Sequence, residues 1–239
     1  MAGYIGKSQG VTQVDGYNRT EADDRYVNAS GDTMTGDLST TGNIIAVNAN
    51  NSNLTRLTLK GTSSEWNISN YGTQFGPNNS FVIADETNAA VRMVIDSAGR
   101  VTMPYQPFFK ATGSLGGVAF STSQAIAYDT VYNNVGNCYN STTSTFVAPV
   151  SGLYQFYASY LTYPNADTSY STLIFSVNGS TTYDRGFRRD AKASQADRNV
   201  SSVMHLNAND TVKVWLEIVN TTSVYNVAGH GHFSGYLIG

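Results

Sequence analysis

Strict alternation of apolar and polar residues in the second half of the chain limits the fold more than any other feature. Every second residue from 212 to 218 is apolar: Val212, Val214, Leu216 and Ile218. A period of two places these side chains on one face of a β-strand. Residues 173–177 and 200–206 repeat the pattern, and Asn178-Gly179 is a strong signal for a tight hairpin. Residues 105–239 are therefore predicted to form an all-β sandwich or jelly roll.

The composition and charge exclude several classes of function. Only 13% of the 239 residues are charged and the net charge is −3, so no basic field would attract nucleic acid. No run of 18 apolar residues is present, and we expect no membrane insertion. The sequence MAGYIGKSQG lacks the apolar stretch of a signal peptide, and Cys138 is the single cysteine. These features predict a protein made in a cytosol and folded without disulfides.

The chain divides by sequence pattern into residues 1–36, 37–104 and 105–239. The first stretch contains GYNRTEADDRYVN, where early acidic residues suit the start of a helix. A helix of about two turns is marginal alone in water, so we expect it to pack against a partner. The second stretch predicts short strands at 54–60, 66–70, 81–84, 91–95 and 100–103. Such a small segment lacks a core of its own, and copies of the same chain are the simplest source of apolar surface.

The segment TSTFVAPVSGLYQF resembles the signature of the C1q domain of the C1q/TNF superfamily. The matching residues are Phe146, Pro149, Val150, Gly152, Tyr154 and Phe156, and the terminal FSGYL matches the last strand of that family. The resemblance implies a ten-stranded jelly roll of two five-stranded sheets, packed as a homotrimer.

The same resemblance implies that Tyr157, Phe233 and Leu237 belong to the trimer core. Tyr157 and Phe233 are expected on strand faces opposite to those of Phe156 and Tyr236. The alternative is that these residues all belong to the core of one sandwich.

The first half of the chain resembles tailed-bacteriophage fibre proteins through GDTMTGDL, through GYNRTEADDRYV, and through a pattern of paired apolar residues ending in VIDSAGRV. This resemblance implies a homotrimer in the virion. Residues 1–36, with Tyr17 and Tyr26, would attach it to the phage tail or baseplate. Residues 37–104 would form a trimeric β-shaft, and residues 105–239 a receptor-binding tip. The alternative is a structural fibre or decoration protein, fixed to the capsid or baseplate, that binds no receptor.

Two clusters in the last region are candidate contacts for a host-surface glycan or outer-membrane protein. Tyrosine offers a flat apolar ring with a polar tip and loses little rotamer entropy on binding. The tyrosine candidates are Tyr160, Tyr163 and Tyr170; half-buried rings at strand ends are the alternative. The basic candidates are Arg185, Arg188, Arg189 and Lys192. A solvated loop with internal ion pairs is the alternative for this basic group.

His230 and His232 could hold a metal only with further ligands, and no carboxylate or thiolate pattern completes such a site. The two glycines beside them, Gly229 and Gly231, favour a turn leading into a last strand. The sequence also lacks a G-x-S-x-G elbow, a phosphate loop and a cysteine–histidine pairing signal. We therefore expect no metal, no cofactor and no enzymatic activity, although cleavage of a polysaccharide is a rival hypothesis.

Overall fold

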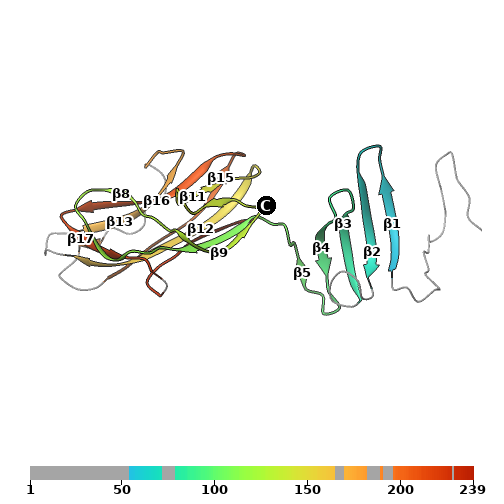
Figure 1. Cartoon of the computed structure of the whole chain (residues 1–239), viewed down its shortest axis with the longest axis horizontal. Coiled ribbons are helices and arrows are strands. Elements are labelled where there is room, and N and C mark those ends of the chain that lie inside the picture. The colour runs from blue at the N-terminus through green and yellow to red at the C-terminus, as the bar shows by residue number, and fades with distance from the viewer. Residues whose placement is uncertain (1–53, 72–78, 165–169, 182–188, 191–195, 228) are drawn as a thin grey trace, which may run out of the picture. The chain divides into compact units, whose positions relative to one another are not determined.

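The computed structural model describes residues 54–71, 79–164, 170–181, 189–190, 196–227 and 229–239 (Figure 1). These residues form strands, turns and loops, with no helix among them, and therefore no helix in this part that could span a membrane. The predicted N-terminal helix, with Tyr17 and Tyr26, lies outside the described residues. The described residues form two bodies of β-structure.

The first body is a five-stranded antiparallel sheet in which the strands follow one another in sequence order. Its strands are β1 (Leu54–Lys60), β2 (Glu65–Tyr71), β3 (Ser80–Asp85), β4 (Ala90–Ile95) and β5 (Val101–Thr102). All five strands predicted from the sequence are present, with bounds that differ by no more than one residue. Asp96 shapes the last turn because its side chain accepts hydrogen bonds from the backbone N–H groups of Ala98 and Arg100, both at 2.9 Å.

The two faces of this sheet differ in what covers them. On one face the side chains are buried, and many of them are polar or small: Asn67, Ser69, Ser80, Val82, Ala84 and Val94. The other face carries the larger apolar side chains, and several of these are exposed. Leu57 is 58% exposed and Phe81 is 43% exposed. An isolated sheet in water would be expected to bury its apolar face and expose its polar one.

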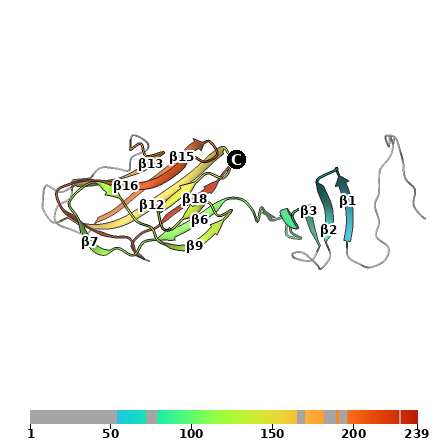
Figure 2. The same ribbon diagram turned by 45° about the horizontal axis from the view of Figure 1, so that its top comes forward.

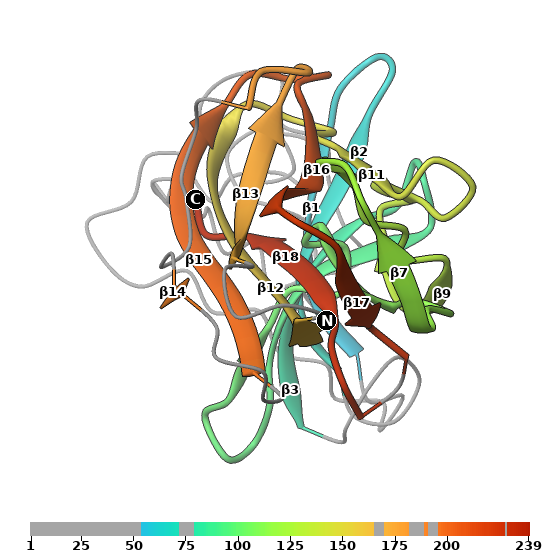
Figure 3. The ribbon, with the colours of Figure 1, turned by 90° about the vertical axis from the view of Figure 1, so that its left-hand side faces the viewer.

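The second body is a sandwich of two antiparallel sheets. The six-stranded sheet consists of β8 (Gln124–Ala125), β10 (Tyr139–Asn140), β11 (Thr145–Val147), β13 (Tyr170–Val177), β14 (Arg189–Asp190) and β16 (Thr211–Val219). β13 and β16 lie side by side along eight residue pairs (Figure 3). The Asn178-Gly179 turn follows β13, with φ angles of 51° and 81°, and Val177 and Ser180 exchange two backbone hydrogen bonds across it. This confirms the predicted hairpin turn.

The seven-stranded sheet consists of β6 (Phe108–Thr112), β7 (Gly116–Phe120), β9 (Thr130–Val135), β12 (Gly152–Pro164), β15 (Ala196–Leu206), β17 (Thr222–Tyr225) and β18 (Phe233–Leu237). β12 is its long central strand. β15 pairs with one side of β12, and the other side is shared by β18 near its start and β17 near its end. Figure 2 shows β12, β18, β6 and β9 side by side in this layer.

The two sheets contain six and seven strands, whereas the resemblance implied five in each. In the seven-stranded sheet β17 and β18 occupy the same row beside β12, and β6 and β7 share the next row. In the six-stranded sheet β8 and β11 share the row on the free side of β16. Short breaks within a row therefore raise the number of strands above the number of rows.

Aromatic rings fill the space between the two sheets. Phe109, Phe146, Phe156, Phe175 and Phe233 are each fully buried, and they meet one another and the buried tyrosines in stacked, tilted and edge-on contacts. The core also contains the alternating residues of two strands, which are Val212, Val214, Leu216 and Ile218 of β16 and Val200, Met204 and Leu206 of β15. The described residues are all-β, and the jelly-roll-like fold is confirmed for the second body.

Phe233 lies on the face opposite to Tyr236, as expected, but that face is the inner one, so its assignment to a trimer core is wrong. Phe233 pairs with Ala158, and Gly235 pairs with Phe156, so all four residues lie on the inner face of the sheet. Tyr157 and Tyr236 lie on the outer face. Phe233 has no exposed surface and packs inside one domain, so its side chain does not reach another copy. Leu237 also faces inward and is partly buried against the core, and a trimer contact stays a prediction for Tyr157 and Leu237.

Candidate functional site

The outer face of the seven-stranded sheet divides into an apolar half and a polar half. The apolar half lies where the chain enters the domain. The entering chain is placed there by Gln106, whose side chain donates a hydrogen bond to the carbonyl of Leu237, at the end of β18, at 3.0 Å. Its exposed side chains are Leu153, Val203, Tyr236 and Ile238. The polar half lies toward the other end of β12, around Ser159, and it is hollowed.

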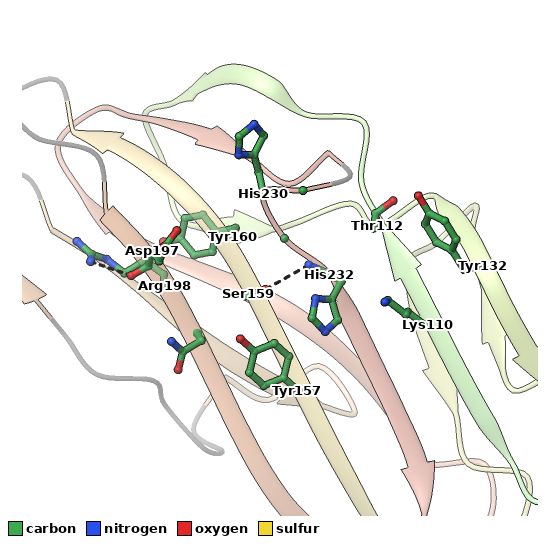
Figure 4. Close-up of a pocket in the computed structure, with 13 residues that line it drawn as sticks. Lys110, Thr112, Tyr132, Tyr157, Ser159, Tyr160, Asp197, Arg198, His230 and His232 are labelled. Atoms are coloured by element: carbon green, nitrogen blue, oxygen red, sulfur yellow. Dashed lines mark hydrogen bonds between the residues drawn. The ribbon is translucent and has the colours of Figure 1, made fainter.

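A groove of about 560 Å³ occupies this polar half (Figure 4). Ligand sites in proteins commonly have volumes of roughly 300–1,000 Å³. The residues around it come from β6, β9, β12, β15 and the segment before β18, and two of them, Tyr160 and Arg198, are buried. The others are Lys110, Thr112, Tyr132, Tyr157, Ser159, Asp197, Asn199, His230 and His232. Most of these residues are polar or aromatic, which suits a ligand with hydroxyl groups and flat apolar faces.

Gly231 sets the floor of the groove beside β12. A Cβ atom at this position would lie 2.3 Å from the carbonyl oxygen of Ser159, so only glycine permits so close an approach. The backbone N–H of Ser159 donates to the carbonyl of His232 at 2.9 Å, and the N–H of His232 donates to the hydroxyl of Ser159 at 3.3 Å. These contacts hold His232 at the groove, while His230 lies exposed in the preceding turn.

His232 and Tyr157 form the aromatic wall of the groove. Their ring centroids are 4.9 Å apart and their planes differ by 30°. Partial burial, with Lys110 nearby, lowers the pKa of His232 below its usual value of 6.5. His232 is therefore neutral near pH 7, and Lys110 supplies the positive charge on this side.

A β-bulge directs Tyr132 toward the same groove. Lys110 pairs with Asn133 and Ala111 pairs with Val131, so Tyr132 is the extra residue of β9. Its ring is 56% exposed. Figure 4 shows Tyr132 and Lys110 on the same side of the groove, across from Tyr160 and Asp197.

The opposite side comes from the start of β15. Asp197 and Asn199 are exposed and carry acceptor and donor groups, while Arg198 is buried between them. The guanidinium Nε of Arg198 donates to the hydroxyl of Ser171 at 3.2 Å, and its Nη1 donates to the carbonyl of Asp197 at 3.3 Å. Arg198 thus stabilises the end of β15, and Asp197 and Asn199 remain facing outward.

This arrangement can bind a ligand, but its groups do not form a known catalytic set. Within the described residues no three histidine, cysteine or acidic side chains approach closely enough to hold a metal. His230 and His232 do not converge, because Figure 4 shows their rings on different parts of the segment. Cys138 is buried in the core, away from the groove, and burial raises the pKa of its thiol to about 11.

The sequence candidates for receptor contact are only partly brought together. Tyr160 as a surface contact is wrong, because its ring is fully buried on the inner parity of β12. Tyr163 and Tyr170 lie at the end of β12 and the start of β13, near the groove end of the domain. Arg189 lies in β14, paired with Ser171. Arg185, Arg188 and Lys192 lie outside the described residues.

The candidates from the sequence did not include Lys110, Tyr132, Asp197 and Asn199, or Tyr157 as a groove residue. No local motif connects them, because four separate strands bring them together. An extra residue at Tyr132 becomes visible only when the pairing of β6 with β9 is known.

The second body matches a known protein family. The model of the C1q family, described as "C1q domain", matches residues 109–238, which is more than half of the chain. The chain belongs to the C1q family. Domains of the C1q and TNF families are typically binding modules without enzymatic activity, and they usually form homotrimers.

Solved structures with a similar fold include three proteins from animals. The globular domain of zebrafish complement 1qA is 16% identical, with a TM-score of 0.42, over 56% of this chain and 98% of that chain. Murine APRIL at pH 5.0 is 12% identical, with a TM-score of 0.44, over 56% and 99%. Eiger TNF from S. frugiperda is 10% identical, with a TM-score of 0.43, over 56% and 94%. No curated protein matches the chain. The C1q assignment rests on the family model.

Proposed function

We propose that this protein is a homotrimeric tail fibre of a tailed bacteriophage, which binds a receptor on the host surface through its C1q domain. The fibre-like motifs of residues 1–104 support the phage origin. The groove on the C1q domain supports receptor binding and is the observation that carries the proposal. In this proposal the N-terminal segment attaches to the tail or baseplate, and residues 37–104 form a shaft of three chains.

The groove favours a surface glycan as the receptor. Tyr157 and Tyr132 offer ring faces of the kind that sugar rings pack against, and Asp197 and Asn199 offer groups that bond hydroxyls. Lys110 would attract an acidic group on the sugar. The groove lies in the half of the sheet away from the point where the chain enters the domain.

The function is adhesion rather than turnover. Three identical grooves on one stalk would turn weak single contacts into firm attachment, because the second and third contacts form at high effective concentration. The apolar half of the same sheet face, around Leu153 and Val203, is then available for contact between the three chains. Tyr157 stands at the border between this half and the groove.

Competition for adsorption tests the proposal. Purified full-length protein, added in excess, should reduce adsorption of the phage to its host. Lys110→Gln and Tyr132→Ser should weaken this competition, while Lys213→Gln, which changes a lysine on the other sheet, should not. Periodate treatment of the host cells should abolish binding if the receptor is a glycan, whereas protease treatment would abolish it if the receptor is a protein.

Two results would favour the rival functions. Unchanged adsorption in the presence of excess protein, together with labelling of the capsid shell in virions, would indicate a structural protein that binds no receptor. New reducing ends released from host polysaccharide would indicate an enzyme.

A further inference from the structure

The open face of the β1–β5 sheet is a large apolar surface in the single chain. One cross-strand row is apolar throughout: Leu57, Ile68, Ile83 and Met93. The rows on either side hold Leu59 and Trp66 next to the buried Asp85, and Phe81, Ile95 and Val101 next to Asn70. Leu57, Leu59, Trp66, Phe81 and Val101 are all exposed. A soluble protein rarely exposes so continuous an apolar surface unless something binds there.

Burial of the opposite face argues against the simplest alternative, in which this sheet turns its apolar side inward within one chain. Asn67 and Ser80 are fully buried on the covered face, beside the small cluster of Val82, Ala84 and Val94. The amide of Asn67 donates to the carboxylate of Glu86 at 2.7 Å, which ties this face to the turn before β4. In the single chain the polar face of the sheet is therefore the buried one, and the apolar face is left available for a partner.

We propose that the partner is the same face of two further copies of this chain, so that three sheets enclose one apolar interior. This inference rests on the proposed homotrimer. The C1q domain begins at residue 109, a few residues after β5, and C1q domains usually form homotrimers. Three chains joined there would hold their sheets together at high effective concentration. The trimer contact of the tip would thus continue into the preceding segment.

The charges around the face favour a protein partner over an acidic lipid surface. The described positions of the apolar rows contain no lysine or arginine. Arg92, which borders the rows, is paired with Asp85 at 2.6 Å and is not free to bind a headgroup. A membrane-binding face would be expected to carry basic residues around its apolar centre.

Trp66 provides a probe within the proposed interior. The chain has two tryptophans, so a full-length Trp215→Phe variant reports on Trp66 alone. Its mass is measured by sedimentation, and the exposure of Trp66 by emission wavelength and acrylamide quenching. We expect a trimer in which Trp66 emission is blue-shifted and quenching is reduced relative to the urea-unfolded chain.

Leu57→Asp and Thr58→Asp form a matched pair on the edge strand β1. Both side chains are exposed in the single chain, but they point to opposite faces. Leu57→Asp should expose Trp66 to quencher, while Thr58→Asp should leave it protected. Equal effects of the two changes would overturn the inference.

The remaining outcomes separate this inference from the proposed function. A trimer with Trp66 as accessible as in the unfolded chain overturns the inference and leaves the trimeric tip standing. Protection that appears only with phosphatidylglycerol–phosphatidylcholine vesicles identifies lipid as the occupant and overturns it as well. Protection that persists in a monomer shows that the chain covers its own face. A monomer at all concentrations contradicts both proposals.

Discussion

Phe233 meets Phe109 edge to face, with ring centroids 4.8 Å apart and an interplanar angle of 80°. The two rings come from β18 and β6, which are neighbouring strands of one sheet. Phe233 also approaches Phe156 and Phe175, the latter from the opposite sheet. It therefore connects the two layers of the sandwich at their centre.

Phe233→Ala should destabilise the fold by roughly 3–5 kcal/mol, because it removes a buried ring and leaves a cavity between the layers. Tyr236→Ala, three residues later, removes a ring that is 48% exposed on the outer face and should cost far less in urea unfolding. If Tyr236 lies at the proposed trimer contact, its loss should instead weaken association in sedimentation. Equal destabilisation by the two changes would contradict this placement of Phe233.

Gly235→Ala should destabilise the C1q domain by about 1–3 kcal/mol, because the core is overpacked by the added methyl group. A Cβ atom there would lie 2.5 Å from the ring of Phe156 and 2.8 Å from that of Phe109. Gly116→Ala is the matched control, since a Cβ atom on that strand residue meets nothing within 4 Å. Urea midpoints of the two variants measure the difference, and similar midpoints would contradict the packing described for Gly235.

His232 should make the domain less stable in mild acid. Its pKa is lowered in the folded state by burial and by Lys110, so the unfolded chain takes up the proton more readily. The stability that neutral His232 contributes is complete above its unfolded pKa of about 6.5, and it is lost as the pH falls from there through the lower pKa of the folded state. Melting temperatures at about pH 7.5 and 5.5 should differ less in His232→Gln than in the native chain. His205→Gln, which changes an exposed histidine, should keep the native difference.

Cys138 should react with a thiol reagent only after unfolding. Burial raises its thiol pKa to about 11, so the thiolate that reacts is scarce as well as shielded at about pH 8. A Thr142→Cys variant supplies a matched exposed thiol a few residues away. With a coloured disulfide reagent, the folded variant should show one fast-reacting thiol and the folded native chain should show none. Rapid reaction of the native chain would show that this end of the core is open.

Much of the fold could be predicted because alternation and turn chemistry are local. The alternation from Val212 to Ile218 is enough to show which face of that strand is buried. Asn178-Gly179 supplies the positive φ angles that its turn requires. The strands of residues 54–102 were equally clear, since turn residues separate them. In these segments one strand contains all the information that its own prediction needs.

The faces of Phe233 and Tyr160 could not be assigned in the same way. In β18 both faces carry an aromatic residue, Phe233 on the inner face and Tyr236 on the outer face. The inner face also contains Gly235, whose side-chain space is filled by rings from other strands, so the sequence does not mark this face as the apolar one. In β12 the inner parity contains Tyr154 and Tyr160 while the outer contains Tyr157, so residue type does not decide. The choice depends on partners in β6, β15 and β18. The groove is harder still, because its residues meet only after these strands pair.

The pairing of β6 with β18 has a consequence for synthesis. β6 leaves the ribosome first among the strands of the C1q domain, yet one of its two neighbours is the last strand of the domain to be made. The contact between Phe109 and Phe233 can form only after β18 has been synthesised, and contacts between residues so distant in sequence form slowly. Tyr139 and Phe146, which also pack against Phe109, are made much earlier than Phe233. The inner layer of the sandwich can therefore begin to pack during translation, but it closes only when the last strand of the domain has been made.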